Sequence, residues 1–194
     1  MEMQWFEKWA VNSFSGLYLR WYLLPRLFSL MEDPLMGTGL ALGPGVGWET
    51  LAIAERFRDT RLIGVDYDPD QVERARGNLA CRPALAGRVA FRQGDATALR
   101  FPDEGFDFAY ELNVLHHIEG YAAAIQEVHR VLRPGAPFFI QDLSRHFFVP
   151  GLRQLFPPES LFTRAELVAE LAGARFIVEE ARGRAIVFVR ARRR

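Results

Sequence analysis

The sequence predicts an α/β fold with a mainly parallel sheet, and three observations support this. Short apolar runs alternate with helical patterns along most of the chain. The helical patterns begin at capping residues. A glycine-rich turn, GPGVG at 43–47, follows the first strand-like run and precedes a helical pattern. A chain of 194 residues also has the usual size of one domain.

Seven strand-like runs share apolar residues bounded by turn residues. In chain order they lie near 40–42, 61–66, 88–93, 106–110, 137–142, 174–180 and 185–191. Gly183 separates the last two runs, which indicates an antiparallel pair at the end of the chain.

Helical patterns connect several of these strands. Asp68 is a suitable N-cap for the helix that opens DPDQVERARGNLA, and Gln71 predicts a capping box with it. AAAIQEVHRVL carries apolar residues at helical spacing. Thr163 and Glu166 predict a second capping box, at the start of TRAELVAEL.

Composition limits the functional class. The chain has 24 basic and 24 acidic residues, whereas a dedicated nucleic-acid binder would carry a basic excess, so no nucleic-acid partner is expected. Cys81 is the single cysteine, which excludes an internal disulfide and a multi-cysteine metal site; we expect no metal and a reducing, cytoplasmic setting. The apolar stretch 17–31 is too short and too often interrupted to predict a transmembrane span.

Polar and glycine residues recur where the first three strands end. Gly43, Gly45 and Gly47 allow a tight turn whose backbone N–H groups approach a ligand. Asp66 ends the second strand, where a carboxylate can accept both hydroxyls of a ribose. After the third strand, Asp95 can accept from the amino group of adenine while the backbone N–H of its neighbour, Ala96, donates to the ring. Together these residues predict a nucleoside-binding site.

The motifs GPGVG, VDYDP, GDATALRFPDEGFD, VLHHI and EVHRVLRPGAPFFI together resemble class I S-adenosylmethionine-dependent methyltransferases. The small-molecule type related to ubiquinone/menaquinone methyltransferases is the most similar, over roughly residues 37–189. The resemblance implies a Rossmann-like sheet of seven strands with an antiparallel last strand and helices on both faces. It also implies S-adenosylmethionine as cofactor, held by the residues named above together with Tyr67 and Glu111.

The chain departs from this family at two positions. The family usually has Asp or Glu two residues before the first glycine, where it contacts the ammonium group of the cofactor; this chain has Ala41. Pro44 replaces a residue that is often small or polar. The cofactor ammonium therefore needs another partner, or the affinity for the cofactor falls.

Glu111 and His116 are the candidate catalytic residues. Glu111 follows the fourth strand, where residues face the methyl group in this fold, and it could instead be a solvent-facing loop acid. His116 and His117 are adjacent, so they point in different directions and do not easily serve one ligand. Methyl transfer itself needs mainly alignment, and a base only for an acceptor such as a hydroxyl.

The N-terminal segment is rich in aromatic residues. We expect residues 1–36 to form a helical cap and residues 37–194 the methyltransferase domain. The cap would cover the acceptor, a small and partly apolar molecule. Two other uses remain open, contact with a membrane surface through residues 5–31 and a homodimer interface.

We keep two other functions as alternatives. A non-catalytic protein that binds S-adenosylmethionine is favoured by Ala41. A nicotinamide-dependent oxidoreductase is disfavoured by the G-x-G-x-G spacing, the Gly94-Asp95-Ala96 loop and the terminal strand pair.

Overall fold

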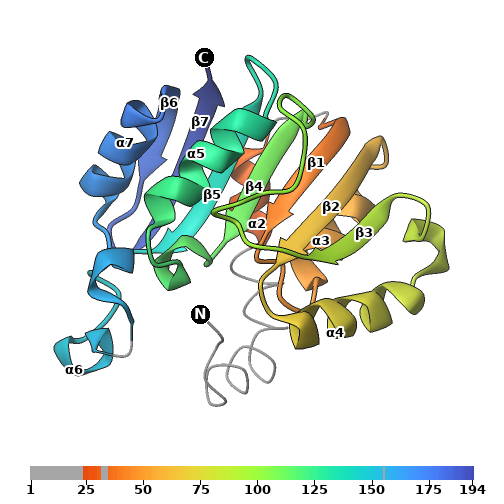
Figure 1. Cartoon of the computed structure of the whole chain (residues 1–194), viewed down its shortest axis with the longest axis horizontal. Coiled ribbons are helices and arrows are strands. Elements are labelled where there is room, and N and C mark those ends of the chain that lie inside the picture. The colour runs from red at the N-terminus through yellow and green to blue at the C-terminus, as the bar shows by residue number, and fades with distance from the viewer. Residues whose placement is uncertain (1–23, 32–34, 155) are drawn as a thin grey trace.

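A computed structural model describes residues 24–31, 35–154 and 156–194. Its centre is a seven-stranded sheet in the order β3-β2-β1-β4-β5-β7-β6 (Figure 1). The strands are β1 (Gly37–Leu42), β2 (Thr60–Asp66), β3 (Val89–Gln93), β4 (Phe108–Leu112), β5 (Pro137–Leu143), β6 (Phe176–Arg182) and β7 (Ile186–Arg193). Neighbours from β3 to β5 pair in parallel, whereas β7 is antiparallel to both β5 and β6. The predicted fold class is confirmed.

Helices cover both faces of the sheet. The described helices are α2 (Leu24–Leu30), α3 (Trp48–Arg56), α4 (Pro69–Ala80), α5 (Tyr121–Val131), α6 (Pro150–Arg153) and α7 (Arg164–Gly173). Buried side chains of α5 and α7 share one core with the sheet, and those of α2, α3 and α4 share the other. Because strand side chains alternate between faces, Leu40 and Leu42 enter the first core and Ala41 enters the second.

Two helix starts test the capping predictions. Thr163 and Glu166 form the expected capping box at α7. At α4, Asp68 is the N-cap and accepts from the backbone N–H of Asp70, but the capping box with Gln71 is wrong. The Asp66 carboxylate already accepts from the backbone N–H of Asp68, at 3.0 Å, so this donor is not left for the side chain of Gln71.

The part of the predicted cap that the structure describes is α2. Leu24, Leu27 and Leu30 are buried, and the last two join the core that α3 and α4 share with the sheet. Residues 1–23, on which most of the cap prediction falls, lie outside the described residues. Within the described residues, no helix combines the length and apolar character needed to cross a membrane.

Candidate functional site

The predicted nucleoside-binding residues meet where adjacent strands β1, β2 and β3 end. The N–H of Gly43 donates to the carbonyl of Val65 at 2.8 Å, which ties the glycine loop to β2. The N–H of Gly94 donates to the carbonyl of Asp66 at 2.9 Å, which ties the loop after β3 to the same strand. Three loops far apart in the sequence therefore form one connected surface.

The Asp66 carboxylate is the centre of this surface. One oxygen accepts from the N–H of Gly45 at 2.8 Å and the other from the N–H of Asp68 at 3.0 Å. Burial raises the pKa of Asp66, while the amides of Asp68 and Gly45 act in the opposite direction. Each carboxylate oxygen can accept more than one hydrogen bond, so both retain capacity for ribose hydroxyls.

The three positions require glycine for different structural reasons. A Cβ on Gly43 would meet the side chain of Val114 at 2.5 Å, and one on Gly47 would meet the ring of Phe91 at 2.6 Å. A Cβ on Gly45 would have Gln71 Oε1 at 3.9 Å as its nearest neighbour. All three have positive φ, which favours glycine. Gly43 and Gly47 thus allow close packing, whereas Gly45 leaves the backbone open to a ligand.

The loop after β3 presents its acid at the surface. Asp95 is exposed, and one of its oxygens accepts from the backbone N–H and the hydroxyl of Thr97, at 2.8 and 2.7 Å. This turn fixes the carboxylate and leaves its second oxygen without a hydrogen-bond partner among the described residues. Ala96 is half-buried beside it, and the side chain of Tyr67 is 53% exposed next to Asp66. The aromatic ring is available for stacking against a flat ligand.

A second half of the site lies where β4 and β5 end. Glu111 is fully buried, and its Oε2 accepts from the N–H of Val114 at 2.9 Å. Its Oε1 has no hydrogen-bond partner among the described residues. Burial, and then the negative charge of Asp142, raise the pKa of Glu111 well above its usual value. Burial and the raised pKa favour the protonated carboxyl group, which can donate a hydrogen bond. The alternative of a solvent-facing loop acid does not hold, because Glu111 is fully buried.

His116 is held by groups from two distant segments. Its Nδ1 is hydrogen-bonded to Asp142, and its backbone N–H donates to the other oxygen of Asp142 at 3.2 Å. The Ser160 hydroxyl donates to the carbonyl of His116 at 2.6 Å. With a carboxylate at Nδ1, the neutral ring carries its proton there and has its basic lone pair on Nε2.

Aromatic rings surround this histidine. The ring centroids of Phe148 and Phe156 lie 5.7 and 5.5 Å from that of His116, and Phe156 also contacts His117. Burial, and then the neighbouring His116, hold the pKa of His117 well below its usual value. The two histidines and two phenylalanines form an apolar wall beside the acidic groups of β4 and β5.

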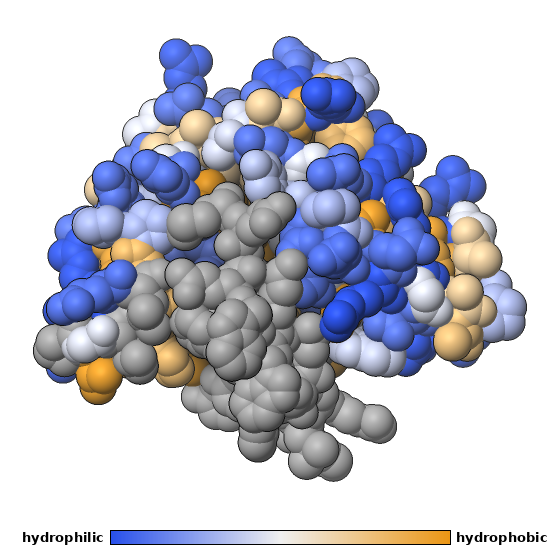
Figure 2. Space-filling view, turned by 60° about the horizontal axis from the view of Figure 1, so that its bottom comes forward, coloured by the Kyte–Doolittle hydropathy of each residue, from blue (hydrophilic) through white to orange (hydrophobic). Residues whose placement is uncertain are grey.

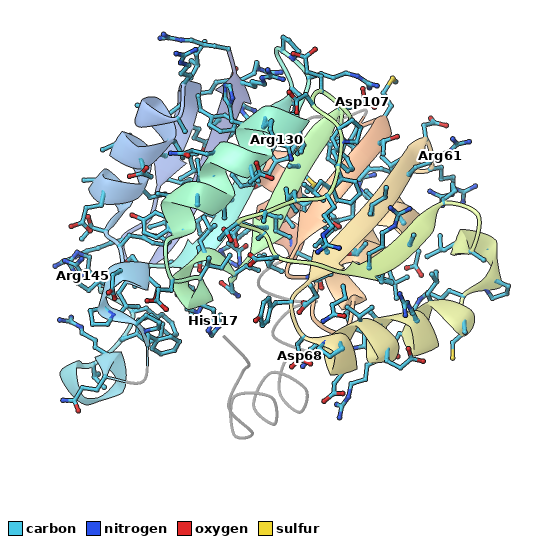
Figure 3. All side chains as sticks on the ribbon, viewed as in Figure 1. Arg61, Asp68, Asp107, His117, Arg130 and Arg145 are labelled. Atoms are coloured by element: carbon cyan, nitrogen blue, oxygen red, sulfur yellow. The ribbon has the colours of Figure 1, made fainter. Side chains whose placement is uncertain are left out.

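The figures locate the two halves. In Figure 3, Asp68 and His117 lie at the same end of the sheet, whereas Asp107 and Arg130 lie toward the opposite end. Figure 2 turns this end toward the viewer, and the part of its surface that is coloured is mainly hydrophilic, with small apolar patches.

Sequence reasoning missed three polar groups at this end of the sheet. Asp142 was taken only as the end of a strand, because nothing local links it to His116. Glu49 is buried in the first turn of α3, although it reads as an ordinary helix acid. Gln71 has a buried Oε1 without a hydrogen-bond partner. A signal was available for Glu49 alone, since an acid next to a glycine loop is a candidate ligand contact.

These residues fit the nucleoside part of S-adenosylmethionine. Asp66 offers a fixed carboxylate for two hydroxyls, Gly45 leaves space for close approach, and Asp95 offers an acceptor at the surface. Adjacent carboxyl ends of parallel strands are also where open α/β sheets bind ligands.

Comparison with known proteins agrees with this geometry. Residues 40–140, more than half of the chain, match the family model described as a methyltransferase domain. A probable S-adenosylmethionine-dependent methyltransferase of Mycolicibacterium smegmatis is 34% identical over 148 residues, which are 74% of this chain and 53% of that protein. Ajmaline N-methyltransferase of Rauvolfia serpentina is 30% identical over 125 residues, 64% of this chain and 42% of that protein.

The chain thus spans about half the length of these two relatives, or less. Among solved structures, an S-adenosylmethionine-dependent methyltransferase of Aquifex aeolicus has a TM-score of 0.79 at 17% identity, covering 98% of this chain and 99% of its own, and so shares the fold. The chain therefore belongs to the methyltransferase-domain family, and its cofactor is S-adenosylmethionine.

Proposed function

We propose that this chain transfers the methyl group of S-adenosylmethionine to a small, partly apolar acceptor. One observation carries the proposal: the Asp66 carboxylate is fixed between the Gly45 and Asp68 amides, in the place and chemistry that a ribose requires. The remaining cofactor-binding residues of the proposal are Gly43, Gly47, Tyr67, Asp95, Ala96 and Glu111.

When bound, the cofactor supplies an electrophilic methyl group on a sulfonium. The chain's own residues must align the acceptor and exclude water, because alignment provides most of the acceleration of an in-line displacement. In this proposal His116 Nε2, the ring nitrogen that is not bonded to Asp142, would take the proton of an acceptor hydroxyl while the methyl group leaves the sulfonium sulfur for the acceptor oxygen. Asp142 would then stabilise the resulting charge on the imidazole.

Glu111 has a different proposed role from His116. Because burial raises the pKa of Glu111, its carboxyl group is better suited to donating a hydrogen bond than to acting as a base. Its Oε1 lacks a hydrogen-bond partner among the described residues, so it can contact a polar atom of the cofactor or the acceptor. We therefore assign Glu111 to positioning and His116 to proton transfer.

The wall of Phe148, Phe156 and His117 supports an apolar acceptor, because it lies beside His116. One relative is named as an N-methyltransferase of ajmaline, which supports a small acceptor. If this chain is related to the ubiquinone/menaquinone methyltransferases, aromatic quinol hydroxyls are the first acceptors to test. A cap of residues 1–36 and a cytoplasmic location are parts of the same proposal.

Binding of S-adenosylhomocysteine to the whole chain tests the cofactor site. Asp66→Asn should weaken binding by about 2–4 kcal/mol, since it removes charge-assisted hydrogen bonds. Asp59→Asn, an exposed acid before β2, is the matched control and should bind as the wild type does. Equal affinity in wild type and Asp66→Asn, measured by calorimetry on folded proteins, would exclude the ribose assignment.

A second candidate, binding without catalysis, is favoured by Ala41, which lacks the carboxylate usual for the ammonium. The discriminating assay offers labelled S-adenosylmethionine with quinol, phenol and amine acceptors. Binding without methylated product across the panel would favour the second candidate.

A further inference from the structure

Glu49 places a buried carboxyl group next to the glycine loop. It is the second residue of α3, and only 8% of it is exposed. Gly47, the N-cap of α3, provides no side-chain hydrogen bond. The carboxyl group of Glu49 instead accepts from Thr50 Oγ1 at 3.2 Å, and the backbone amides of Glu49 and Thr50 act to lower its pKa. It thus fills the end of the helix that would otherwise attract an external anion.

A chain of hydroxyl groups connects Glu49 to the strand that carries Ala41. Tyr110 lies beside Ala41 in the parallel register of β1 and β4. The Tyr110 hydroxyl donates to Thr50 Oγ1 at 2.9 Å, and Thr50 Oγ1 donates to Glu49 Oε1 at 3.2 Å. The carboxyl group that β1 lacks at Ala41 is therefore present nearby, supplied by α3.

A second acceptor flanks the same loop. Gln71 is buried, its Oε1 has no hydrogen-bond partner among the described residues, and this atom lies 3.9 Å from the position of a Cβ on Gly45. An unsatisfied buried acceptor is costly unless a ligand or water supplies a donor. The surroundings of the glycine loop therefore favour a ligand that carries hydrogen-bond donors and positive charge.

We propose that Glu49 is the partner of the cofactor's ammonium group, in place of the carboxylate missing at Ala41, and that it releases its proton when the ammonium binds. The inference rests on the proposed function, because it assumes that the cofactor occupies the glycine loop. It assigns a cofactor contact to a residue outside the family motif, and it adds the release of one proton when the cofactor binds.

The electrostatics of the ligand-free chain support the proton release. Burial raises the pKa of Glu49 to about 8, and the charge of Asp66 adds a smaller effect in the same direction. The interactions with its own backbone N–H and with Thr50 lower this pKa, but burial outweighs them. Within residues 24–31, 35–154 and 156–194, the titratable groups facing it are Asp66 from β2 and Tyr110 from β4, and the pKa of this tyrosine is raised by burial and by Glu49. Neither is a cation, so Glu49 is mostly protonated at neutral pH.

The proton balance of binding is simple. The O–H bond of the Glu49 carboxyl breaks, the proton goes to buffer, and the carboxylate pairs with the ammonium. A nearby positive charge favours the ionised carboxyl and lowers its pKa. Affinity for the cofactor should therefore increase as the pH rises toward 8, by up to about tenfold per pH unit.

Calorimetry on the full chain at pH 7 tests this, with S-adenosylhomocysteine titrated in buffers of different ionisation enthalpy. We expect roughly 0.5–1 proton released for each ligand bound. Methylthioadenosine, which has the nucleoside but neither ammonium nor carboxylate, should release far less. The pKa of Asp66 is also raised, so Asp66 could release a proton when either ligand binds. The difference between the two ligands therefore reports the proton released by Glu49.

Glu49→Gln should abolish the proton release and flatten the pH dependence of S-adenosylhomocysteine binding, while methylthioadenosine binds with unchanged affinity. Glu55→Gln, an exposed position on the same helix, is the control. The wild-type measurement stands even if Glu49→Gln folds poorly. Tight binding without proton release would overturn the inference and leave the proposed function intact. Failure of both ligands to bind the wild type would overturn both.

Discussion

The two halves of the site are built in different ways. At the ends of β1, β2 and β3, carboxylates accept from backbone amides of the same or adjacent loops, as Asp66 does from Gly45 and Asp68. At the ends of β4 and β5, His116 is held by distant segments: its Nδ1 is hydrogen-bonded to Asp142, and its backbone carbonyl accepts from the Ser160 hydroxyl. Backbone loops suffice to hold a polar ligand, whereas a basic nitrogen in an apolar wall needs partners from several elements.

The largest expected effect is on the β4–β5 half. His116→Gln should lower kcat by about 10²–10⁴-fold if His116 takes the acceptor's proton, and should leave the affinity for S-adenosylhomocysteine unchanged. Steady-state kinetics with a hydroxyl acceptor and calorimetry measure the two quantities. His146→Gln, an exposed histidine after β5, is the control. If the variant lost as much cofactor affinity as kcat, His116 would also serve cofactor binding, and the two halves of the site would not have separate roles.

Deletion of residues 1–23 tests the cap. The deletion stops before α2, because Leu27 and Leu30 are buried in the core. Methyl transfer should fall by about tenfold or more through loss of water exclusion, while cofactor binding stays near the wild-type value. A deleted protein that folds and methylates at the full rate would show that the cap does not contribute to the acceptor side.

Two glycine variants sharpen the comparison within the β1–β3 half. Gly47→Ala should lower the free energy of unfolding by about 1–3 kcal/mol, because the new methyl group meets the ring of Phe91. Gly45→Ala should cost less stability and more cofactor affinity, since its new methyl group enters open space at the loop. Thermal melting and calorimetry give both values. The assignment of Gly45 as the ligand-facing glycine would fail if the two variants behaved alike.

The smallest expected effect is a pH dependence of stability. Folding raises the pKa of Glu49 to about 8, so the folded chain holds this proton where the unfolded chain, with a pKa of about 4.3, has lost it. The stability contributed by the proton is full below about pH 4.3 and is lost as the pH rises toward 8. The melting temperature of Glu49→Gln relative to wild type should therefore rise from pH 5 to pH 8. A difference independent of pH would contradict the raised pKa.

Much of the first half could be predicted from the sequence. Gly43, Gly45, Gly47, Asp66 and Asp95 are signals of local turn chemistry, and alternation of strands and helices brings them to one edge of the sheet. The predicted capping box at Gln71 was wrong. Whether Asp66 or Gln71 accepts from the backbone N–H of Asp68 depends on the folded conformation of the loop between β2 and α4.

The second half could be predicted only in part. Glu111 and His116 were predicted as candidates from a position after the fourth strand, but Glu111 lies within β4 because this strand continues to Leu112. The raised pKa of Glu111 depends on burial and on Asp142. The partnership of His116 and Asp142 spans 26 residues and requires β4 to lie beside β5. The aromatic wall depends on the path of the chain after β5, which has no periodic pattern.

The antiparallel strand β7 has a consequence for biosynthesis. β5, whose first six residues are buried, lies between β4 and β7, yet β7 follows every other strand in chain order. Until β7 leaves the ribosome, the nascent chain carries an apolar strand with one open edge, which is a template for aggregation. Once β7 is in place it is an interior strand, and β6 is the edge of the finished sheet. The arginines at 190 and 192 of β7 pair with Glu179 of β6, so the segment that covers β5 also holds the new edge strand.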